Sequence, residues 1–362
     1  LAARIAVASI EDVSALLRPV LDGGHVHIAG RLAGGMRAIG RVATANEIVE
    51  TLRAAQMEVQ EAQPFEVALT PGPAGRPESP YVQRMRLMWQ QMRQHVMEEF
   101  PAPAEVPSDV AATLAQVEER YVADAYHSLS IEGYRVTPEL IEKVRNGQWQ
   151  PDGEDAKTRD AMAAKGYFEA HIRVKDYIAS VIAAKPDKWP LYEAVTSWYR
   201  ALFSPSVTAG ILKASDLAGW RNDQVFIRGA LHVPLSKEAV RECMPVFFEL
   251  LAVEPHPAAR AVLGHFFFVY IHPYMDGNGR LARFIFNAML VTGGYVWTIV
   301  PFEQRKPYMA GLEQASSHGN VKPLAKFFAD LVRDQSKHPL PRPKGGLPGP
   351  GAGGAAPPAG SS

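Results

Sequence analysis

The stretch IHPYMDGNGRLAR, residues 271–283, decides the fold that we expect for this chain of 362 residues. An apolar run, GHFFFVYI, ends at Ile271. Pro273 then stops the helix, because its ring removes a backbone donor and clashes with the preceding turn. A second apolar run, FIFNAMLV, follows at residues 284–291. The sequence therefore predicts a helix, a tight loop and a second helix that begins near Arg280.

Glycines and arginines give this loop the pattern of a phosphate-binding site. Gly277 and Gly279 carry no Cβ, so the backbone can approach an anion closely, and the free N–H groups that start the next helix point toward it. Arg280 and Arg283 lie three positions apart, so both guanidinium groups can reach the same phosphate chain. The loop lacks the Walker pattern G-x-x-x-x-G-K-[ST], which excludes a P-loop.

Two further side chains of the loop add chemistry. Asp276 supplies a hard oxygen ligand, and one carboxylate beside a polyphosphate is a usual way to hold Mg²⁺. His272 has an ordinary pKa of about 6.5, so it can accept a hydroxyl proton near neutral pH. An ordinary hairpin turn is the alternative, since Asp-Gly and Asn-Gly are strong turn dipeptides, but a hairpin needs no cations at this spacing. We therefore expect a phosphate-transfer site.

The rest of the chain is predicted to be mostly α-helical, because apolar residues recur at helical spacing in many segments. Ser108 is the expected N-cap of one helix, and Thr137-Pro138 opens another. The best strand signal is QVFIRGALHVP, residues 224–234, in which two short triplets flank a Gly229-Ala230 turn, as in a two-residue hairpin.

Composition divides the chain into segments with different expected roles. They are a small N-terminal α+β appendage (1–69), a Pro- and Gly-rich linker (70–80), a helical region (81–150), a core (151–337) and a disordered Pro- and Gly-rich tail (338–362). Within the appendage, HVHIAGRL at residues 25–32 could be a strand, whereas residues 46–57 look helical.

The overall charge points to no nucleic acid and no membrane. Lys plus Arg and Asp plus Glu both number 38, so no long-range field attracts the chain to either surface. Residues 284–302 are 19 residues without a formal charge, but Asn287 and Gly293-Gly294 interrupt them, so we expect a buried helix. Cys243 is the single cysteine, which favours a cytoplasmic location.

The segment HPYMDGNGRLAR resembles the signature of the Fic-domain (Fic/DOC) family, H-P-F-x-D/E-G-N-G-R-x-x-R. Eight of its nine fixed positions match, and Tyr274 stands where phenylalanine is usual. The resemblance extends across most of residues 108–335. It implies a Fic-type helical bundle with a small β-hairpin flap. It also implies transfer of AMP from ATP to a Ser, Thr or Tyr hydroxyl of a target protein, with release of pyrophosphate.

The resemblance assigns a role to each residue of the loop. His272 would be the base for the target hydroxyl, and Asp276 would be the Mg²⁺ ligand. The other residues would bind phosphates: Asn278 and the amides of Gly277 and Gly279 the α- and β-phosphates, and Arg280 and Arg283 the outer ones. Family members that act as phosphotransferases carry lysine where this chain has Gly279, so the glycine favours AMP transfer.

The resemblance also places two binding surfaces. Residues 224–234 correspond to the flap, an exposed edge on which the backbone of the target lies as an added strand. The expected docking residues are Val225, Phe226, Ile227, Arg228 and Gly229. The expected adenine pocket is formed by Tyr308, Met309, Leu312 and Ser316, with core packing as the alternative for Met309 and Leu312. A homodimer is compatible with the family.

The segment SLSIEG, residues 128–133, resembles the inhibitory pattern S/T-x-x-x-E-G/N of the class whose inhibitory helix precedes the core. Ser128 begins the pattern, and Gly133 would end the helix as its C′ residue. On physical grounds, Glu132 could form a bidentate pair with Arg283 and occupy the guanidinium group that the γ-phosphate needs.

Several other functions stay open at this point. The same site could remove AMP from a modified target or transfer another nucleotide. A metal hydrolase built on His272 and Asp276 would need more ligands, and His232, His256 and His265 lack a zincin-like spacing. A nucleotide-binding helical interaction or regulatory module would not need His272 and Asp276 together.

Overall fold

The structure, a computed structural model, describes residues 26–55, 57, 59, 61, 78–149, 155–185 and 191–343, with the backbone alone at 26–27 and 155–158. It divides the chain into two units, Leu1–Pro77 and Glu78–Ser362. Residues 1–25, residues 70–77 of the expected linker and the expected tail from residue 344 onward lie outside the described residues.

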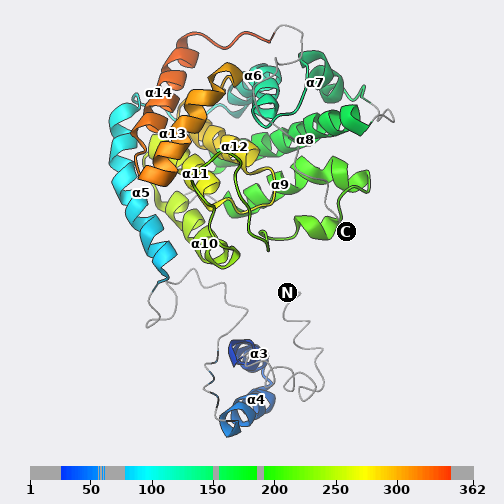
Figure 1. The fold of residues 1–362 in the computed structure, drawn as a ribbon, viewed down its shortest axis with the longest axis vertical. Helices are drawn as coiled ribbons and strands as arrows, with labels where there is room; N and C mark the ends of the chain where they lie inside the picture. The colour runs from blue at the N-terminus through cyan, green and yellow to red at the C-terminus, as the bar shows by residue number, and fades with distance from the viewer. Residues whose placement is uncertain are drawn as a thin grey trace. The chain divides into compact units, whose positions relative to one another are not determined.

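The described part of the first unit contains a pair of helices, α3 (Val26–Ala38) and α4 (Val42–Ala54), which pack against each other (Figure 1). The helices bury a small core of Ala29, Ala33, Met36, Ala45, Ile48, Val49 and Leu52. From residue 26 on, helix replaces the strand expected at 25–32, because the buried residues of α3 recur at helical rather than alternating spacing. The β part of the expected α+β appendage is therefore not found among its described residues.

The second unit is built from helices, which confirms the expected mostly α class. Its elements are α5 (Pro80–Glu99), α6 (Val110–Ile131), α7 (Pro138–Arg145), α8 (Asp155–Ala184), α9 (Leu191–Thr208), η1 (Ala214–Leu217), α10 (Lys237–Val253), α11 (Pro257–Ile271), α12 (Asn278–Thr292), η2 (Phe302–Gln304), α13 (Arg305–His318) and α14 (Lys322–Lys337). Residues 78–149, 155–185 and 191–343 contain no strand.

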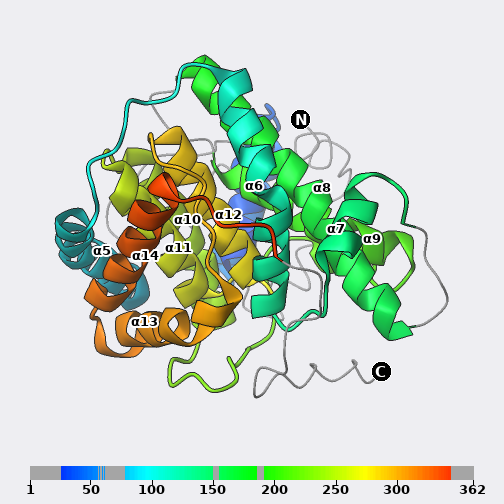
Figure 2. The same ribbon diagram turned by 90° about the horizontal axis from the view of Figure 1, so that it is seen from above.

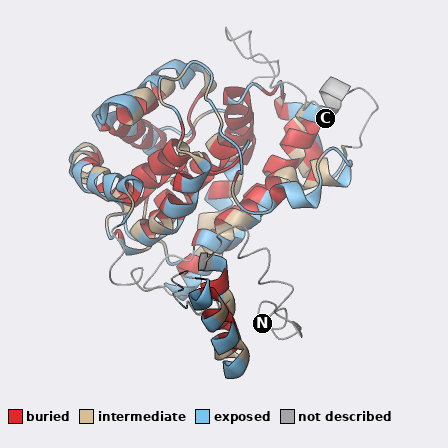
Figure 3. Ribbon diagram, turned by 60° about the horizontal axis from the view of Figure 1, so that its bottom comes forward, coloured by how far each residue is buried: buried red, intermediate tan, exposed pale blue. Residues whose placement is uncertain are grey.

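The two helices expected on either side of the loop, α11 and α12, lie at the centre of this unit. Figures 1 and 2 show α5, α13 and α14 on one side of them and α6, α7, α8 and α9 on the other. Buried residues run through the middle of the unit, and the outer faces of the surrounding helices are exposed (Figure 3). In α12 every residue from Arg280 to Thr292 is buried, so the loop that precedes it is held by a packed core.

Local sequence signals set the ends of several helices. The Thr137 hydroxyl accepts a hydrogen bond from the Leu140 amide at 3.2 Å, and Pro138 occupies the first turn, as predicted. At α6, however, the cap is Asp109 and not Ser108: its carboxylate accepts a hydrogen bond from the Ala112 amide at 2.9 Å. Asp and Ser cap helices about equally well, so adjacent candidates are not separated by sequence alone.

The end of α6 follows the prediction for Gly133. This residue has φ +87°, a left-handed conformation that glycine adopts without steric cost. The Gly133 amide donates to the Ser130 carbonyl at 3.0 Å, and the Tyr134 amide donates to the Leu129 carbonyl at 3.1 Å. These two bonds form a Schellman motif, which fixes the position of Glu132 at the C-cap.

Residues 224–234 form an extended excursion with a turn, but not the expected β-hairpin. The turn is centred on Arg228 and Gly229, one residue earlier than predicted, with the Ala230 amide donating to the Ile227 carbonyl at 3.1 Å and Gly229 at φ +78°. Side chains rather than a backbone ladder connect the limbs: the Gln224 amide group donates to the Pro234 carbonyl at 2.9 Å. Two limbs alone, without a third strand, are marginal as a sheet.

The uncharged stretch at residues 284–302 forms the rest of α12 and the buried segment after it. Within the ranges that the structure describes, no helix combines the length and the apolar character needed to cross a membrane.

Candidate functional site

The loop between α11 and α12 has a left-handed residue near each end. His272 is the C-cap of α11, with φ +54° and ψ 62°, and its amide donates to the Phe268 carbonyl at 3.0 Å. Gly277 is the N-cap of α12, with φ +84°. A left-handed conformation costs an L-residue about 1–2 kcal/mol, so the loop holds His272 against a local preference. The helix–loop–helix prediction is confirmed, and α12 begins two residues before Arg280.

Asn278 braces this loop from inside. Its side-chain oxygen accepts from the Tyr274 amide at 3.0 Å, and its side-chain nitrogen donates to the Tyr274 carbonyl at 2.8 Å. The asparagine side chain therefore ties the loop to itself, whereas the resemblance implies that it binds a phosphate. Tyr274 is buried and stacks on Tyr199, with ring centroids 3.7 Å apart, so the aromatic residue in the signature is an anchor.

His272 is arranged to accept a proton. Its Nδ1 lies 3.3 Å from the Val269 carbonyl, and because a carbonyl can only accept, the ring proton belongs on Nδ1 and Nε2 is the acceptor. Burial lowers the pKa of His272 to about 4, with Arg221 adding to the shift; the Val269 carbonyl, Glu132 and Asp276 oppose it. The imidazole is therefore neutral at pH 7, the state that a general base requires.

Arg280 lies buried in the first turn of α12. Its guanidinium group is 5.2 Å from the ring centroids of both Tyr134 and Phe203, which stabilise the cation through their faces. One nitrogen donates to the Asp276 carboxylate at 3.1 Å, while the buried Nε has no partner. The Asp276 side chain itself is 65% exposed. The Arg280 guanidinium group is thus held in place, its Nε is free to donate, and the Asp276 carboxylate beside it is accessible to solvent.

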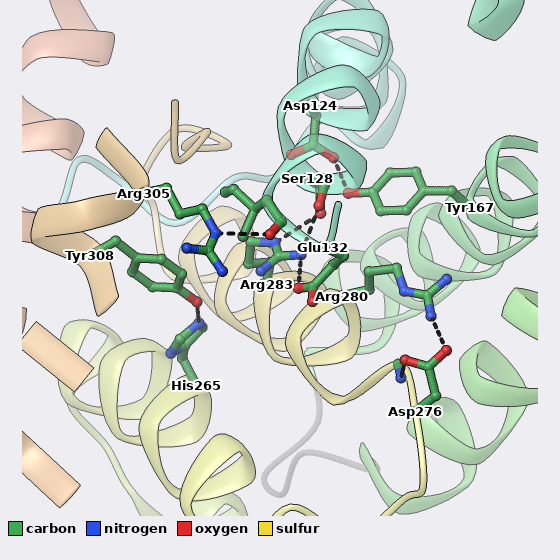
Figure 4. A network of polar contacts seen from close by, with 12 residues as sticks. Asp124, Ser128, Glu132, Tyr167, His265, Asp276, Arg280, Arg283, Arg305 and Tyr308 are labelled. Atoms are coloured by element: carbon green, nitrogen blue, oxygen red, sulfur yellow. Dashed lines mark hydrogen bonds and ion pairs between the residues drawn. The ribbon is translucent and has the colours of Figure 1, made fainter. Parts of the chain in front are cut away.

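Arg283 connects α12 to the end of α6 (Figure 4). Its Nε donates to the Ser128 hydroxyl at 2.8 Å, and one terminal nitrogen donates to the Ser128 carbonyl at 3.0 Å and to Glu132 Oε1 at 2.7 Å. The other terminal nitrogen is buried without a partner. Burial alone would lower the pKa of Arg283, but the Glu132 carboxylate raises it above its usual range. The expected ion pair forms, through one carboxylate oxygen rather than two.

Glu132 lies directly over the second glycine of the loop. A Cβ built at Gly279 would meet Glu132 Oε1 at 2.2 Å and a terminal nitrogen of Arg283 at 3.3 Å. The carboxylate therefore occupies the space above the first turn of α12, where the anion cradle was expected. Only a residue without a side chain leaves room for it.

The sequence analysis did not identify Asp124, a buried carboxylate on α6 about two turns before Glu132. Asp124 accepts a hydrogen bond from the Tyr167 hydroxyl at 2.6 Å (Figure 4). Burial raises the pKa of Asp124 to about 6, although the hydrogen bond from Tyr167 and the Arg283 charge oppose the shift. Asp124, Ser128 and Glu132 follow one another at four-residue spacing on α6, and that spacing was the available signal.

The expected docking residues lie on the excursion at 224–234. Phe226, Arg228 and Gly229 are exposed, with Phe226 at 76%, and Val225 and Ile227 are half-buried. The far limb is attached to the helices: the Leu231 amide donates to Glu313 at 3.2 Å, and His232 contacts the Tyr270 carbonyl at 2.9 Å. The structure therefore presents an apolar surface whose base is fixed.

The four residues of the expected adenine pocket differ in their burial and contacts. Tyr308 is buried, and its hydroxyl lies 2.8 Å from Nε2 of His265 (Figure 4). Leu312 is also buried in the core, while Met309 is half-buried. Ser316 lines a cavity of about 580 Å³ together with residues such as Tyr81, Leu231 and Tyr270. Core packing describes Tyr308 and Leu312 in this structure.

The donor chemistry of the loop fits a magnesium ion shared with phosphates. Asp276 is an exposed carboxylate beside the helix N-terminus, and Mg²⁺ usually takes one or two carboxylates plus phosphate oxygens and water. In the parts of the chain with described side chains, no three His, Cys, Asp or Glu residues gather as a cage. The histidines that a hydrolase would need lie elsewhere: His265 contacts Tyr308, His232 contacts Tyr270, and His256 caps α11.

Comparisons with known proteins agree with the resemblance. A model of the Fic/DOC family matches residues 189–290. The protein adenylyltransferase Fic of Nematostella vectensis is 28% identical over 250 residues, which are 68% of this chain and 55% of that protein. The protein of the same name from Drosophila mojavensis is 28% identical over 222 residues, 59% of this chain and 40% of that protein. The chain thus spans about half the length of these curated relatives.

A solved structure supports the fold. Fic-1 from C. elegans, described as aa134–508, superposes with a TM-score of 0.52 at 18% identity and covers 92% of this chain and 95% of that chain. At this identity the match concerns the helical architecture alone.

Proposed function

Because this chain carries a Fic/DOC family domain at residues 189–290, we propose that it is a protein adenylyltransferase, which transfers AMP from ATP to a Ser, Thr or Tyr hydroxyl of a target protein. The observation that carries the proposal is the geometry of the loop: the His272 imidazole at the end of α11 has Nε2 as its acceptor and precedes α12, whose first two turns hold the buried Arg280 and Arg283.

His272 acts on the target hydroxyl. Its free Nε2 accepts the hydroxyl proton as the oxygen forms a bond to the α-phosphorus of ATP. The bond from the α-phosphorus to the bridging oxygen breaks, and pyrophosphate leaves with the electron pair. The products are an AMP-modified hydroxyl, pyrophosphate and a protonated imidazole, which returns its proton to solvent.

The first turn of α12 holds the phosphates. The backbone amides that follow Gly277 and the positive end of the helix face an anion in this position. Arg280 and Arg283 each keep one buried donor without a partner, and a triphosphate supplies acceptors for both. When Mg²⁺ is bound, Asp276 would hold it against the phosphate oxygens, where it neutralises part of their charge.

The target segment docks on residues 224–234. Their backbone groups are not paired in a ladder, and the far limb is attached to the helices through Leu231 and His232, so an extended peptide can add to the near limb at residues 225–228. The exposed Phe226 beside Val225 and Ile227 gives this edge an apolar character, which favours targets with apolar residues near the modified hydroxyl.

Glu132 keeps the enzyme inhibited. Its carboxylate occupies Arg283 and the space above Gly279, so the γ-phosphate cannot reach the guanidinium group while the ion pair persists. Bringing a triphosphate beside this carboxylate also places like charges together, which costs free energy.

The test is intact mass spectrometry after incubation with ATP and Mg²⁺. Glu132→Gln should raise self-modification by AMP at least about tenfold, because a neutral amide binds Arg283 more weakly than a carboxylate does. The matched control is Glu119→Gln, an exposed residue on the same helix, which should leave the yield unchanged. His272→Ala should abolish the modification in both backgrounds. Products without protein-bound nucleotide would indicate a hydrolase, and equal yields from both glutamine variants would reject the inhibitory role.

A further inference from the structure

A single buried arginine connects the proposed base to both ends of the docking segment. Arg221 is 3% exposed and lies just before the excursion. Its Nε donates to the His272 carbonyl at 2.8 Å, one terminal nitrogen donates to the Asp223 carbonyl at 2.6 Å, and the other donates to the Leu235 carbonyl. Its backbone amide donates to the Pro273 carbonyl at 2.9 Å. The hydrogen bonds of this side chain thus go to backbone carbonyls.

The hydrogen bond from Arg221 to the His272 carbonyl restrains a residue whose backbone is strained, because His272 has φ +54°. Lys185 is the only other non-glycine residue with a positive φ in the described ranges. A strained residue persists where its surroundings determine it. The His272 amide is held by the Phe268 carbonyl of its own helix, and its carbonyl is held by Arg221. Without Arg221, the backbone of His272 would lose one of these two restraints, the one on its carbonyl.

The contacts with Asp223 and Leu235 act on the excursion between them. A β-ladder would hold such limbs together, but none is present at 224–234. The limbs are closed at their base by Arg221 and, one residue further out, by Gln224 with Pro234. The guanidinium group therefore sets the place where this segment leaves the helical core.

We propose that Arg221 is a positioning residue that fixes the docking segment and the His272 backbone on one rigid guanidinium group, so that a docked target meets an imidazole in the correct orientation. This inference rests on the proposed function. Arginine suits the task because its planar fork can donate in several fixed directions, whereas lysine offers a point charge on a flexible stem.

Arg221 has a second effect that can be measured separately. It contributes to the lowered pKa of His272, together with the dominant effect of burial. The groups that oppose it are the Val269 carbonyl from α11, Glu132 from α6 and Asp276 from the loop. Removing the positive charge should therefore move the pKa of His272 upward, which a purely structural arginine elsewhere would not do.

The test compares Arg221→Met, Arg221→Lys and a matched control, Arg120→Met, in the full chain. Arg120 likewise donates to two backbone carbonyls, those of Trp297 and Gln335, but it does not contact the loop. Amide hydrogen exchange is measured without nucleotide on peptides that cover residues 222–235 and 269–275. Arg221→Met should increase exchange in both peptides, and Arg120→Met in neither.

Two further measurements separate positioning from stability. The ring of His272, assigned in NMR spectra by its loss in His272→Ala, should titrate at higher pH in Arg221→Met and stay near its original pKa in Arg221→Lys. In an Arg221→Met enzyme with the glutamate also replaced, Glu132→Gln, kcat for self-modification should fall at least about tenfold. The KM for ATP should stay within about twofold, because the phosphate contacts come from α12.

Increased exchange in only one of the two peptides, or the same increase in Arg120→Met, would overturn the proposal. If Arg221→Met does not fold, Arg221→Lys decides: the lysine keeps the charge but cannot reach three carbonyls, so both peptides must still exchange faster than in the unmutated protein. If the unmutated and Glu132→Gln proteins transfer no AMP, the proposed function is wrong. The hydrogen-exchange and NMR titration measurements still test whether Arg221 couples the docking segment to His272.

Discussion

At the residue scale, the site depends on groups held in unusual states by their neighbours. His272 combines a left-handed backbone, a proton fixed on Nδ1 by the Val269 carbonyl, and a pKa lowered by burial. Gly279 has room for the Glu132 carboxylate only because it lacks a Cβ. Each of these states leads to a measurement.

The pKa of His272 predicts the acid limit of activity. Burial lowers this pKa to about 4, so the ring stays neutral, and able to accept a proton, well below pH 6.5. At pH 6 the Glu132→Gln enzyme should keep most of its pH 7 rate, whereas a base with the ordinary pKa of about 6.5 would leave about one-quarter of the ring neutral. A rate profile between pH 5 and pH 8 checks this. Half-loss of the rate near pH 6.5 would contradict it.

The same shift affects stability, with a sign that follows from linkage. The folded-state pKa of His272 lies below the unfolded one, so the unfolded chain binds more protons between about pH 4 and pH 6.5. This residue therefore contributes stability that is complete above about pH 6.5 and is lost as the pH falls toward 4. Replacing His272 should remove that part of the acid destabilisation.

Gly279 and Glu132 should be coupled in stability. In the unmutated protein, Gly279→Ala places a Cβ against Glu132 Oε1 and should destabilise the fold by about 1–2 kcal/mol, since the carboxylate must leave its ion pair. In a Glu132→Gly background the same alanine should be neutral or stabilise by about 0.5 kcal/mol, because alanine favours helix over glycine. Denaturant unfolding of the four proteins gives the coupling energy; an additive result would mean that the two residues do not touch.

At the scale of elements, α6 and its C-cap place three polar side chains near α12. Asp124, Ser128 and Glu132 lie on one face, and Tyr167 on α8 contacts the first of them. The Schellman motif after Ile131 fixes the end of α6, so the position of Glu132 depends on how the whole helix packs. Release of the proposed inhibited state would therefore require a change at the end of α6 or in its contacts with α8.

The variant Asp124→Asn tests how the buried carboxylate on α6 contributes to stability. Burial raises the folded-state pKa of Asp124 to about 6, above its ordinary value, so the folded chain binds more protons between about pH 4 and pH 6. The contribution of Asp124 to stability is therefore complete at low pH and is lost as the pH rises through about 6.

Relative to the asparagine variant, the unmutated protein should lose about 1–3 kcal/mol of unfolding free energy between pH 4 and pH 7. Denaturant titrations at several pH values measure this difference. The control is Asp334→Asn, an exposed aspartate on α14. A difference between unmutated and Asp124→Asn proteins that does not change with pH, or that grows in the opposite direction, would contradict the prediction.

At the scale of the whole molecule, local residue patterns predicted the local structure, whereas the pairing of Glu132 with Arg283, 151 positions apart, was expected only with the help of the family resemblance. The helix–loop–helix at 271–283 follows from a proline, two glycines and two apolar runs that act within a few residues of one another. The contact of Asp124 with Tyr167 joins residues 43 positions apart, and those of Arg221 reach 51 positions to His272, so no spacing rule indicates them. The β-hairpin expected at 224–234 is not formed: the side chain of Gln224 and that of Arg221, which lies outside the segment, connect the limbs in place of a ladder.

The proposed inhibited state also predicts how nucleotide changes the stability of the whole chain. A ligand that binds the folded state raises the free energy of unfolding by RT ln(1 + [L]/Kd), so tenfold tighter binding adds about 1.4 kcal/mol when ligand is in excess. Because Glu132 occupies Arg283, ATP with Mg²⁺ should raise the melting temperature of Glu132→Gly more than that of the unmutated protein. The variant Arg283→Met in the Glu132→Gly background is the control and should lose the extra shift. Equal shifts in all three proteins would mean that the γ-phosphate does not use Arg283 and that the Glu132 carboxylate, whether at Arg283 or above Gly279, does not compete with bound ATP.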